Sequence, residues 1–405
     1  MFMTVADRVS PPSPARASDA RSPFARLNDL LALITPGKTP INCAVGEPQH
    51  PVPSFVGPTL AANIGDFGRY PANKGTDEFR RAVVRWLFWR YRLPRPLDPE
   101  HDVLVLNGTR EGLFLAAIAA KHFVAPRKGM PAILVPNPCY AAYTAGARGA
   151  ECEIMYLPAT AASGFLPDLD ALSEDLFART VAFYLATPAN PQGAVADENY
   201  LARLVALARR FGFLVFADEC YSEIYSGDPP PGMLEVAGPD YANVVVFHSL
   251  SKRSSLPGLR VGFAAGDRNF LTRFLDMRNT AAPQVPMPAQ AVAIAAYGDE
   301  THVEENRRLY AEKFDLADQI IGTRFGYRRP AGGFFLWLDV SAQGGSVKVA
   351  ERLWREAGLR VLPGGYAAQT DAQGNNPGAD YIRIAMVHDK DTTAEALRRL
   401  IAVLG

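Results

Sequence analysis

The sequence predicts an α/β protein in which a mostly parallel sheet carries helices on both faces, with a smaller α+β domain beside it. Between residues 103 and 265, short apolar runs alternate with segments of helical periodicity. Strands that alternate with helices in this way usually pair in parallel, because each helix crosses over the sheet and returns the chain to its starting edge. The length of 405 residues is sufficient for one large α/β body and a smaller partner domain.

Seven strands are expected in the sheet, each a short apolar run that polar or turn residues follow. Their ranges are 103–106, 132–135, 152–157, 181–185, 214–217, 244–247 and 261–265. Helical spacing predicts helices at 77–91, at 201–211, and from the turn at 107–112 to about residue 124.

The segments before and after this region predict the smaller domain. Residues 24–34 have helical spacing, and residues 41–45 form a short extended piece. Beyond residue 288, helices are expected at 303–321, 347–357 and 392–404, and strands at 332–337 and 381–387. The expected division is a flexible leader (1–23), a first part of the small domain (24–50), a large domain (51–287) and the rest of the small domain (288–405).

The composition argues against several classes of partner. The 42 Lys and Arg residues balance 42 Asp and Glu residues, which gives no support to binding of nucleic acid or of an anionic membrane. The four cysteines are scattered without a CxxC pair, so neither a disulfide framework nor a metal site is expected. No apolar run approaches the ~20 residues of a membrane helix, and the leader lacks the apolar core of a secretory signal. We therefore expect a cytoplasmic protein.

Lys252 is unusual because the chain has only eight lysines, and it is the only one in residues 129–312. It follows the predicted strand 244–247, beside the hydroxyls of Ser249 and Ser251. A desolvated lysine amine can lose its proton and attack a carbonyl carbon, whereas arginine keeps its proton in proteins. This stretch leaves two interpretations open: a nucleophilic lysine, and a lysine that extends its ammonium into solvent at a strand end.

Ligands of open parallel sheets bind beyond the carboxyl ends of the strands. Five of the predicted strands end in groups of complementary chemistry: an anion-binding turn at a helix start, an aromatic ring, an amide, a carboxylate and an amine. These groups are Gly108-Thr109-Arg110, Tyr140, Asn190, Asp218 with Tyr221, and Ser249-Leu250-Ser251-Lys252. Singly, the turn can merely begin a helix, the first tyrosine can be a core residue and the aspartate a cap. Together they match pyridoxal 5′-phosphate, which has a phosphate, a ring, a phenolate, a pyridine nitrogen and an aldehyde.

The order and spacing of these residues resemble the fold-type I pyridoxal-phosphate aminotransferases, class I/II branch, over roughly residues 24–404. The resemblance is carried by Gly46-Glu47-Pro48, Tyr70 with Gly75, Gly108-Thr109-Arg110, Tyr140, Asn190-Pro191, Asp218, Tyr221, Ser249 to Lys252, Arg260 and Arg383. It implies a large domain around a seven-stranded, mostly parallel sheet, and a small domain built from both terminal segments.

The resemblance also implies roles around the cofactor ring. Lys252 binds the cofactor aldehyde covalently and then moves the substrate proton. Asp218 keeps the ring nitrogen protonated, which makes the ring an electron sink. Tyr221 and Asn190 hydrogen-bond the phenolic oxygen, and Tyr140 stacks on the ring. Cys220 is expected to be an apolar contact below it.

Further roles concern the phosphate and the substrate. The backbone of Gly108, Thr109 and Arg110 is expected to bind the phosphate together with Ser249, Ser251 and Arg260. Arg383 binds the substrate α-carboxylate, although without the resemblance a salt bridge at a strand edge would be preferred. Gly46 and Asn190 border the substrate. Tyr70 reaches the phosphate of a neighbouring subunit, so a homodimer with shared active sites is implied.

Four stretches resemble the succinyldiaminopimelate aminotransferases of bacterial lysine biosynthesis, namely 24–27, 249–258, 361–364 and 376–383. This implies transfer of an amino group from glutamate to N-succinyl-2-amino-6-oxopimelate, so that the partners are small amino and keto acids. The loop 365–369 departs from the pattern and leaves the acceptor open. A further cation should bind the distal carboxylate of the substrate. The candidates are Arg253, Arg328 and Arg329.

Other functions remain as alternatives. Another class I/II aminotransferase, acting on aromatic, aspartate or other α-amino acids, or a lyase on the same fold would need the same cofactor groups. A transcription regulator with an aminotransferase-like domain needs a DNA-binding domain, for which the leader is too short. Ser249 and Lys252 also fit the S-x-x-K motif of serine acylases, but no K-T-G follows. No nucleotide-binding glycine motif occurs.

Overall fold

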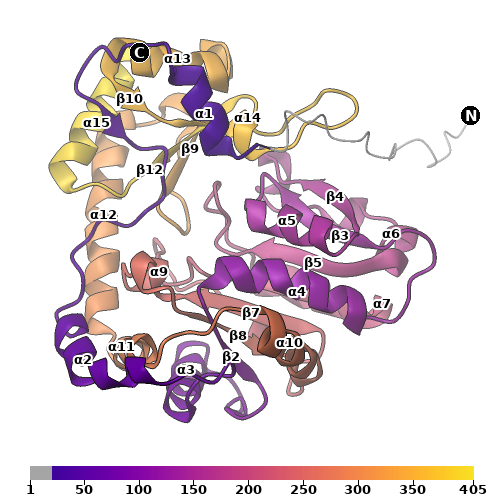
Figure 1. Ribbon diagram of the computed structural model, residues 1–405. Helices are drawn as coiled ribbons and strands as arrows, with labels where there is room; N and C mark the ends of the chain where they lie inside the picture. Colours follow the sequence, from indigo (N-terminus) through magenta and orange to yellow (C-terminus); the bar gives the residue numbers. More distant parts are fainter. Residues whose placement is uncertain (1–20) are drawn as a thin grey trace, which may run out of the picture.

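A seven-stranded sheet forms the centre of the larger domain in the computed structural model, which describes residues 21–405. The strand order is β2-β8-β7-β6-β5-β3-β4, and β8 is antiparallel to both neighbours while the other pairs are parallel. The prediction of a mostly parallel sheet is confirmed (Figure 1). The strands are β2 (Val103–Leu106), β3 (Ala132–Asn137), β4 (Glu153–Pro158), β5 (Thr180–Ala186), β6 (Leu214–Asp218), β7 (Val244–Ser249) and β8 (Gly262–Gly266).

Helices cover both faces of this sheet, so successive residues of a strand enter two different cores. Leu104 and Leu106 of β2 belong to one hydrophobic core, and Val103 and Val105 belong to the other. The first core is shared with α4 (Thr109–Phe123), α5 (Ala141–Gly149) and α10 (Arg268–Ala281). The second is shared with α2 (Val56–Ala62), α3 (Asp77–Arg90), α6 (Glu174–Arg179), α7 (Glu198–Phe211), α8 (Met233–Val236) and α11 (Met287–Tyr297).

The smaller domain combines segments from both ends of the described chain. In Figure 1 the indigo helix α1 lies among the orange and yellow elements at the top. A three-stranded antiparallel sheet, β11-β12-β9, and a parallel pair, β1-β10, form its strands. The elements are α1 (Pro23–Leu31), β1 (Ile41–Asn42), β9 (Phe335–Asp339), α13 (Ser346–Ala357), β10 (Leu359–Arg360), β11 (Leu362–Pro363), α14 (Gly364–Ala367), β12 (Tyr381–Ala385) and α15 (Lys390–Leu404).

Helix α12 (Thr301–Ile321) connects the two domains and runs along one side of the molecule in Figure 1. The preceding helix α11 contacts α2 and α3, and its residues Val292 and Ala293 are buried in a core of the seven-stranded sheet. We therefore propose that the large domain extends to Tyr297, beyond the boundary expected at residue 287.

Several helices of the large domain were absent from the prediction, and the longest of them are α5, α10 and α11. Helix α5 contains Gly146 and Gly149, which lower its intrinsic helix propensity. At Gly146 an added Cβ would lie 2.9 Å from the carbonyl oxygen of Phe114, so this glycine allows α5 to approach α4 closely. Packing in the tertiary structure therefore stabilises a helix that the local sequence does not favour.

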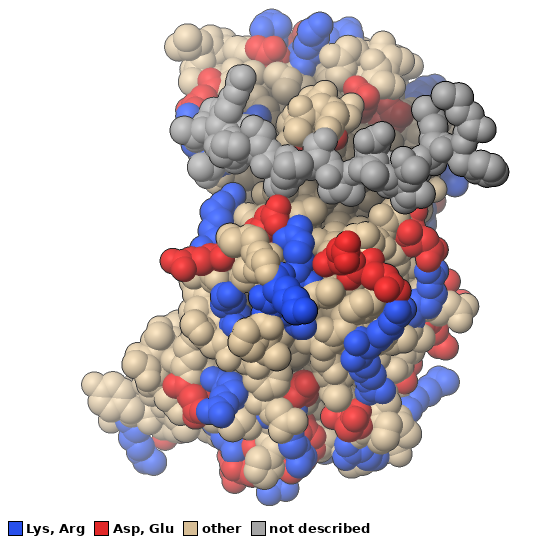
Figure 2. Space-filling view, turned by 90° about the vertical axis from the view of Figure 1, so that its right-hand side faces the viewer, with Lys and Arg blue, Asp and Glu red and all other residues tan. Residues whose placement is uncertain are grey.

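Charged side chains are distributed over the surface of the molecule that Figure 2 shows. Basic and acidic side chains are interspersed over the face shown in Figure 2, which agrees with the equal numbers in the sequence. Within residues 21–405, no helix is both long and apolar enough to cross a membrane. Most of the predicted leader, residues 1–20, lies outside the described part of the chain.

Candidate active site

Lys252 lies just beyond the carboxyl end of β7, on the short helix α9 (Leu250–Arg253). The Ser249 hydroxyl accepts a hydrogen bond from the backbone N–H of Ser251 at 3.1 Å, and this cap begins the helix. The Lys252 Nζ donates to the carbonyl oxygen of Gly46, which belongs to the segment that follows β1. The amine of Lys252 thus contacts the chain segment that follows β1 of the small domain.

The surroundings of Lys252 make its amine easier to deprotonate than that of a solvated lysine. Burial lowers the pKa of Lys252 to about 8. Its Nζ lies 5.1 Å from the ring centre of Phe334 and 5.8 Å from that of Tyr221. Among the described residues, no carboxylate forms an ion pair with it. A lysine that merely extends into solvent would keep its ordinary pKa, so the geometry supports the nucleophilic interpretation.

Asp218 ends the neighbouring strand β6 and is buried. The Tyr143 hydroxyl donates to its Oδ2 at 2.7 Å, and the backbone N–H of Cys220 donates to its Oδ1 at 3.3 Å. Burial raises the pKa of Asp218, so a cationic partner would be needed to stabilise its charged form. Tyr143 was missed at the sequence level; its only signal is its place one helical turn after Tyr140.

An anion-binding arrangement lies where α4 begins. Gly108 precedes this helix with a φ of 76°, and a Cβ there would lie 2.2 Å from a guanidinium nitrogen of Arg260. Arg260 donates to the carbonyl oxygens of Asn107 and Pro257 but pairs with no carboxylate in residues 21–405. The Ser249 and Ser251 hydroxyls are hydrogen-bonded to each other at 2.9 Å. A guanidinium without a carboxylate partner and two hydroxyls close to a helix N-terminus fit a phosphate.

The Thr109 side chain connects this arrangement to the end of β6. Its Oγ1 lies 3.2 Å from the Cys220 Sγ. Burial raises the pKa of the Cys220 thiol, which agrees with an unreactive contact residue.

Arg383 comes from β12 of the small domain and is buried with 7% of its surface exposed. It donates to the Oδ1 of Asn190 at 3.2 Å and to the carbonyl oxygen of Ala44 at 2.7 Å. Its Nε has no hydrogen-bond partner in the described chain, and no carboxylate pairs with it there. Burial lowers the pKa of Arg383 to about 10. A buried cation without a counter-charge is costly unless a ligand supplies one.

Tyr140 and Tyr221 border the same region. Tyr140 follows β3, and its hydroxyl accepts a hydrogen bond from the Nε of Arg110 at 2.7 Å. The Tyr221 ring packs edge-on against Phe334 at 5.3 Å between centres. Burial raises the pKa of Tyr221 far above its ordinary value, so its hydroxyl is a hydrogen-bond donor. Tyr70 differs from these residues: it is 95% exposed and contacts none of them.

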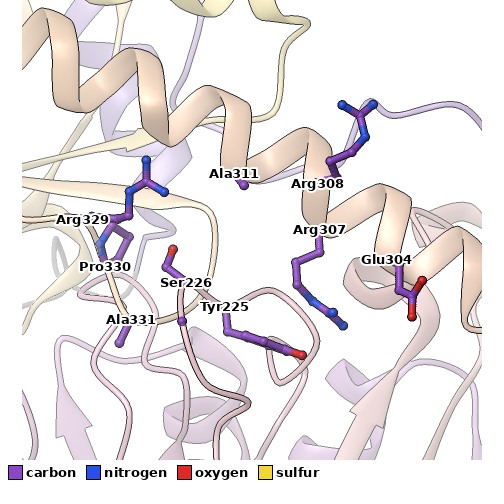
Figure 3. A pocket seen from close by; sticks show the side chains of 10 residues that line it. Tyr225, Ser226, Glu304, Arg307, Arg308, Ala311, Arg329, Pro330 and Ala331 are labelled. Carbon is purple, nitrogen blue, oxygen red and sulfur yellow. The ribbon is translucent and has the colours of Figure 1, made fainter.

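A cavity of about 770 Å³ lies away from these residues, between α12, the 225–227 loop and the 329–331 loop (Figure 3). It is called the larger cavity below. Its arginines already have carboxylate partners: Arg307 pairs with Glu223, Arg308 with Glu305 and Glu312, and Arg329 with Asp315 and Asp318. Since these arginines already contact carboxylates, we regard the cavity as a weaker site for an acidic substrate than the region of Arg383.

Two candidates for the distal carboxylate must therefore be corrected. Arg329 is held by two aspartates at the larger cavity. Arg253 is buried in an ion pair with Glu300, and its guanidinium lies 5.2 Å from the ring centre of Trp86. Arg253 thus serves the packing of the core, whereas Arg329 belongs to a partly exposed group of ion pairs. Arg328, the third candidate, is exposed.

The residues present fit pyridoxal phosphate. A poised amine, a buried carboxylate, an anion-binding helix start and a stacking ring occur at neighbouring strand ends of one sheet. Lys252 would hold the aldehyde, Asp218 the ring nitrogen, and Gly108 with Arg260 the phosphate. When bound, the cofactor supplies an electron sink for the substrate carbon.

Comparison with known proteins shows the family of the chain. The family described as aminotransferase class I and II matches residues 38–400. The chain is 33% identical over 390 residues to an LL-diaminopimelate aminotransferase of Desulforudis audaxviator (strain MP104C), covering 94% of this chain and 95% of the relative. It is 32% identical over 389 residues to the LL-diaminopimelate aminotransferase of Moorella thermoacetica (strain ATCC 39073 / JCM 9320), with the same coverage.

Two solved structures are similar along nearly their full length. An aminotransferase from Neisseria meningitidis Z2491 has a TM-score of 0.89 at 36% identity and covers 95% of this chain and 98% of that structure. Aminotransferase AspB from Helicobacter pylori 26695 has a TM-score of 0.87 at 30% identity with the same coverage. The chain therefore belongs to the class I and II aminotransferases, which depend on pyridoxal phosphate.

Proposed function

We propose that this aminotransferase exchanges an amino group between glutamate and a diaminopimelate-type substrate. The observation that carries the proposal is the likeness, over 94% of the chain, to relatives named LL-diaminopimelate aminotransferase. The buried and unpaired Arg383 supports it, because an amino-acid substrate brings the α-carboxylate that this cation lacks.

In this proposal the residues act as follows. Arg383 and Asn190 orient the substrate carboxylate, and the Lys252 Nζ takes the proton from the substrate Cα. Tyr143 holds the Asp218 carboxylate toward the ring nitrogen. The Tyr221 hydroxyl donates a hydrogen bond to the phenolic oxygen, and Tyr140 covers the ring. The low pKa of Lys252 keeps its amine close to the working range of a general base at neutral pH.

The acylated form of the substrate is a second candidate. The likeness of 249–258, 361–364 and 376–383 to succinyldiaminopimelate aminotransferases favours N-succinyl-diaminopimelate, whereas the named relatives favour the free LL-diaminopimelate. Loop 365–369 is held at the site, since the Asn137 amide donates to the carbonyl oxygen of Gln369 at 2.9 Å. The Gln369 N–H returns a hydrogen bond of 2.8 Å to the Asn137 side chain. This loop is a suitable place for the discrimination between the two forms.

A homodimer belongs to the same proposal. Ile64, Phe67 and Tyr70 expose 67%, 61% and 95% of their surfaces, which forms an apolar region around the short helix η3 (Ile64–Gly68). A second copy would cover this region and would bring Tyr70 to the phosphate of its partner.

A donor screen tests the proposal. The holoenzyme is incubated with 2-oxoglutarate and, in separate reactions, LL-diaminopimelate, its N-succinyl form, aspartate and phenylalanine, and glutamate is measured. We expect kcat/KM for one diaminopimelate form to exceed that for aspartate and phenylalanine by about 100-fold or more. A preference for aspartate or phenylalanine would overturn the substrate assignment, and product without glutamate would indicate a lyase.

A further inference from the structure

Three polar side chains form a hydrogen-bonded series at the joint between the domains. The Lys313 Nζ lies 2.7 Å from the Nε2 of His50, and the Nδ1 of His50 lies 2.6 Å from the Oδ1 of Asn306. The Asn306 Nδ2 then donates to the backbone carbonyl oxygens of Lys252 at 3.0 Å and Arg253 at 3.2 Å. The series thus ends on the backbone of the residue that carries the reactive amine.

The direction of every hydrogen bond in the series follows from its first member. An ammonium group has only donors, so the Nε2 of His50 must accept the proton from Lys313. The Nδ1 of His50 then carries the ring hydrogen and donates to the Oδ1 of Asn306. With its oxygen occupied in this way, Asn306 presents its NH₂ group to the two carbonyl oxygens. Ser255 donates a further hydrogen bond to the same Oδ1 at 3.1 Å.

The series depends on a neutral imidazole, because a protonated ring would repel Lys313. Burial, followed by the charge of Lys313, lowers the pKa of His50 to about 4. The Tyr310 ring packs on the imidazole at 4.4 Å between centres, and Glu305 is the acidic group that faces it. Lys313 is itself buried, with a pKa of about 8, and remains mostly protonated near pH 7.

The series also connects Lys252 to both halves of the small domain. His50 lies four residues after Gly46, whose carbonyl oxygen accepts from the Lys252 Nζ. Lys313 donates a second hydrogen bond to the carbonyl oxygen of Met386 at 3.1 Å, and Met386 directly follows the strand that carries Arg383. The backbone and the amine of Lys252 are therefore both held by groups that depend on the position of His50.

We propose that His50 is a positioning residue for Lys252: it fixes the orientation of Asn306, which holds the α9 backbone, and it anchors the segment whose Gly46 carbonyl contacts the amine. The proposal rests on the proposed role of Lys252 as the cofactor-binding lysine. His50 touches neither the reacting atoms nor the cofactor-binding groups described above, so it acts only through Asn306 and Gly46.

The test compares His50→Leu with His50→Gln in the full-length protein. The amide of Gln can accept from Lys313 and donate to Asn306, whereas Leu can do neither. In the apo-protein, the pKa of the Lys252 amine is measured from the pH dependence of its labelling by an amine reagent, with the labelled peptide quantified by mass spectrometry. We expect His50→Leu to raise this pKa by about 0.5–1 unit as water reaches the amine, and to raise the dissociation constant for pyridoxal phosphate about tenfold.

The controls separate positioning from general stability. His302→Leu removes a second half-buried histidine, which lies on α12 and contacts Ser254 and Asp299 but not Asn306. This variant should leave the Lys252 pKa unchanged. His50→Gln should retain both wild-type values. If His50→Leu does not fold, Asn306→Ala replaces it, because alanine favours helix α12 and should allow folding. It removes the amide that holds the Lys252 backbone, so it should give the same two changes. Three outcomes would overturn the proposal. They are wild-type values of the Lys252 pKa and the dissociation constant in His50→Leu, equal shifts of both in His302→Leu, or shifted values in His50→Gln.

The role of Lys252 is checked separately. Borohydride reduction of the wild-type holoenzyme should fix the cofactor on Lys252, as seen by peptide mass spectrometry. Absence of that adduct would remove the proposed role of Lys252. Its presence, combined with unchanged values in His50→Leu, would refute only the role of His50.

Discussion

Two groups of cations lie near the joint between the domains, and they differ in their counter-charges. Lys252 is half-buried and Arg383 is buried beside the ends of the sheet strands, and neither pairs with a carboxylate in the described part of the chain. Arg307 and Arg329 line a cavity of about 770 Å³, and each is neutralised by acidic side chains. The arginines of this cavity thus already contact carboxylates, whereas Lys252 and Arg383 do not.

Because of this difference, we place the proposed ligand site at the unpaired cations and not at the cavity. Burial of a cation costs free energy that the folded chain normally recovers through an ion pair. We propose that a ligand carboxylate offsets this cost at Arg383, and that the amine of Lys252 instead binds an aldehyde. The following variants test the comparison, beginning with the largest expected effect.

Lys252→Ala should abolish transamination, with a loss of at least ~10³-fold in kcat, because no other amine can replace its proton transfer. The visible absorption of the lysine-bound cofactor should also disappear. Steady-state rates and the absorption spectrum measure the two effects. Ordinary activity in this variant would end the assignment of the site.

Arg383→Lys should raise KM for the amino-acid substrate roughly 10- to 100-fold, because a lysine cannot form the two parallel hydrogen bonds of a guanidinium. The affinity for pyridoxal phosphate should change little, since Arg383 faces the substrate. Kinetics and cofactor titration separate the two quantities, and equal losses in both would contradict the role.

The pH dependence of cofactor capture tests the low pKa of Lys252. The apo-protein reacts through the neutral amine, whose fraction rises with pH and reaches one half at about 8. The capture rate should therefore rise about tenfold per pH unit below that midpoint and level off above it. Rapid-mixing absorbance gives the profile. A midpoint near 10.5, the ordinary lysine value, would mean that the amine is solvated.

Arg329→Gln should have the smallest effect, because it removes partly exposed ion pairs at the larger cavity. We expect activity within about twofold of wild type and a loss of at most ~1 kcal/mol in the free energy of unfolding. Urea denaturation and the donor assay measure these quantities. A large rise in KM for the acidic substrate would instead restore Arg329 as its distal ligand and would remove the contrast between the two regions.

Much of the fold could be predicted because its signals are local. Each strand of the seven-stranded sheet is a short apolar run, and helices on both faces require such runs to be apolar throughout. Helix α5 could not be predicted, since its glycines disfavour a helix and its contacts with α4 and with the sheet stabilise it.

The site divides in the same way. The sequence by itself determined which chemical groups stand at the ends of the strands, from the anion-binding turn at Gly108 to the amine of Lys252, because parallel strands bring such positions to one edge. Only the tertiary structure decided which charges stay unpaired, that Tyr143 holds Asp218, and that His50 reaches the backbone of Lys252 through Asn306. Those facts depend on contacts between residues far apart in the chain, and no local pattern records them.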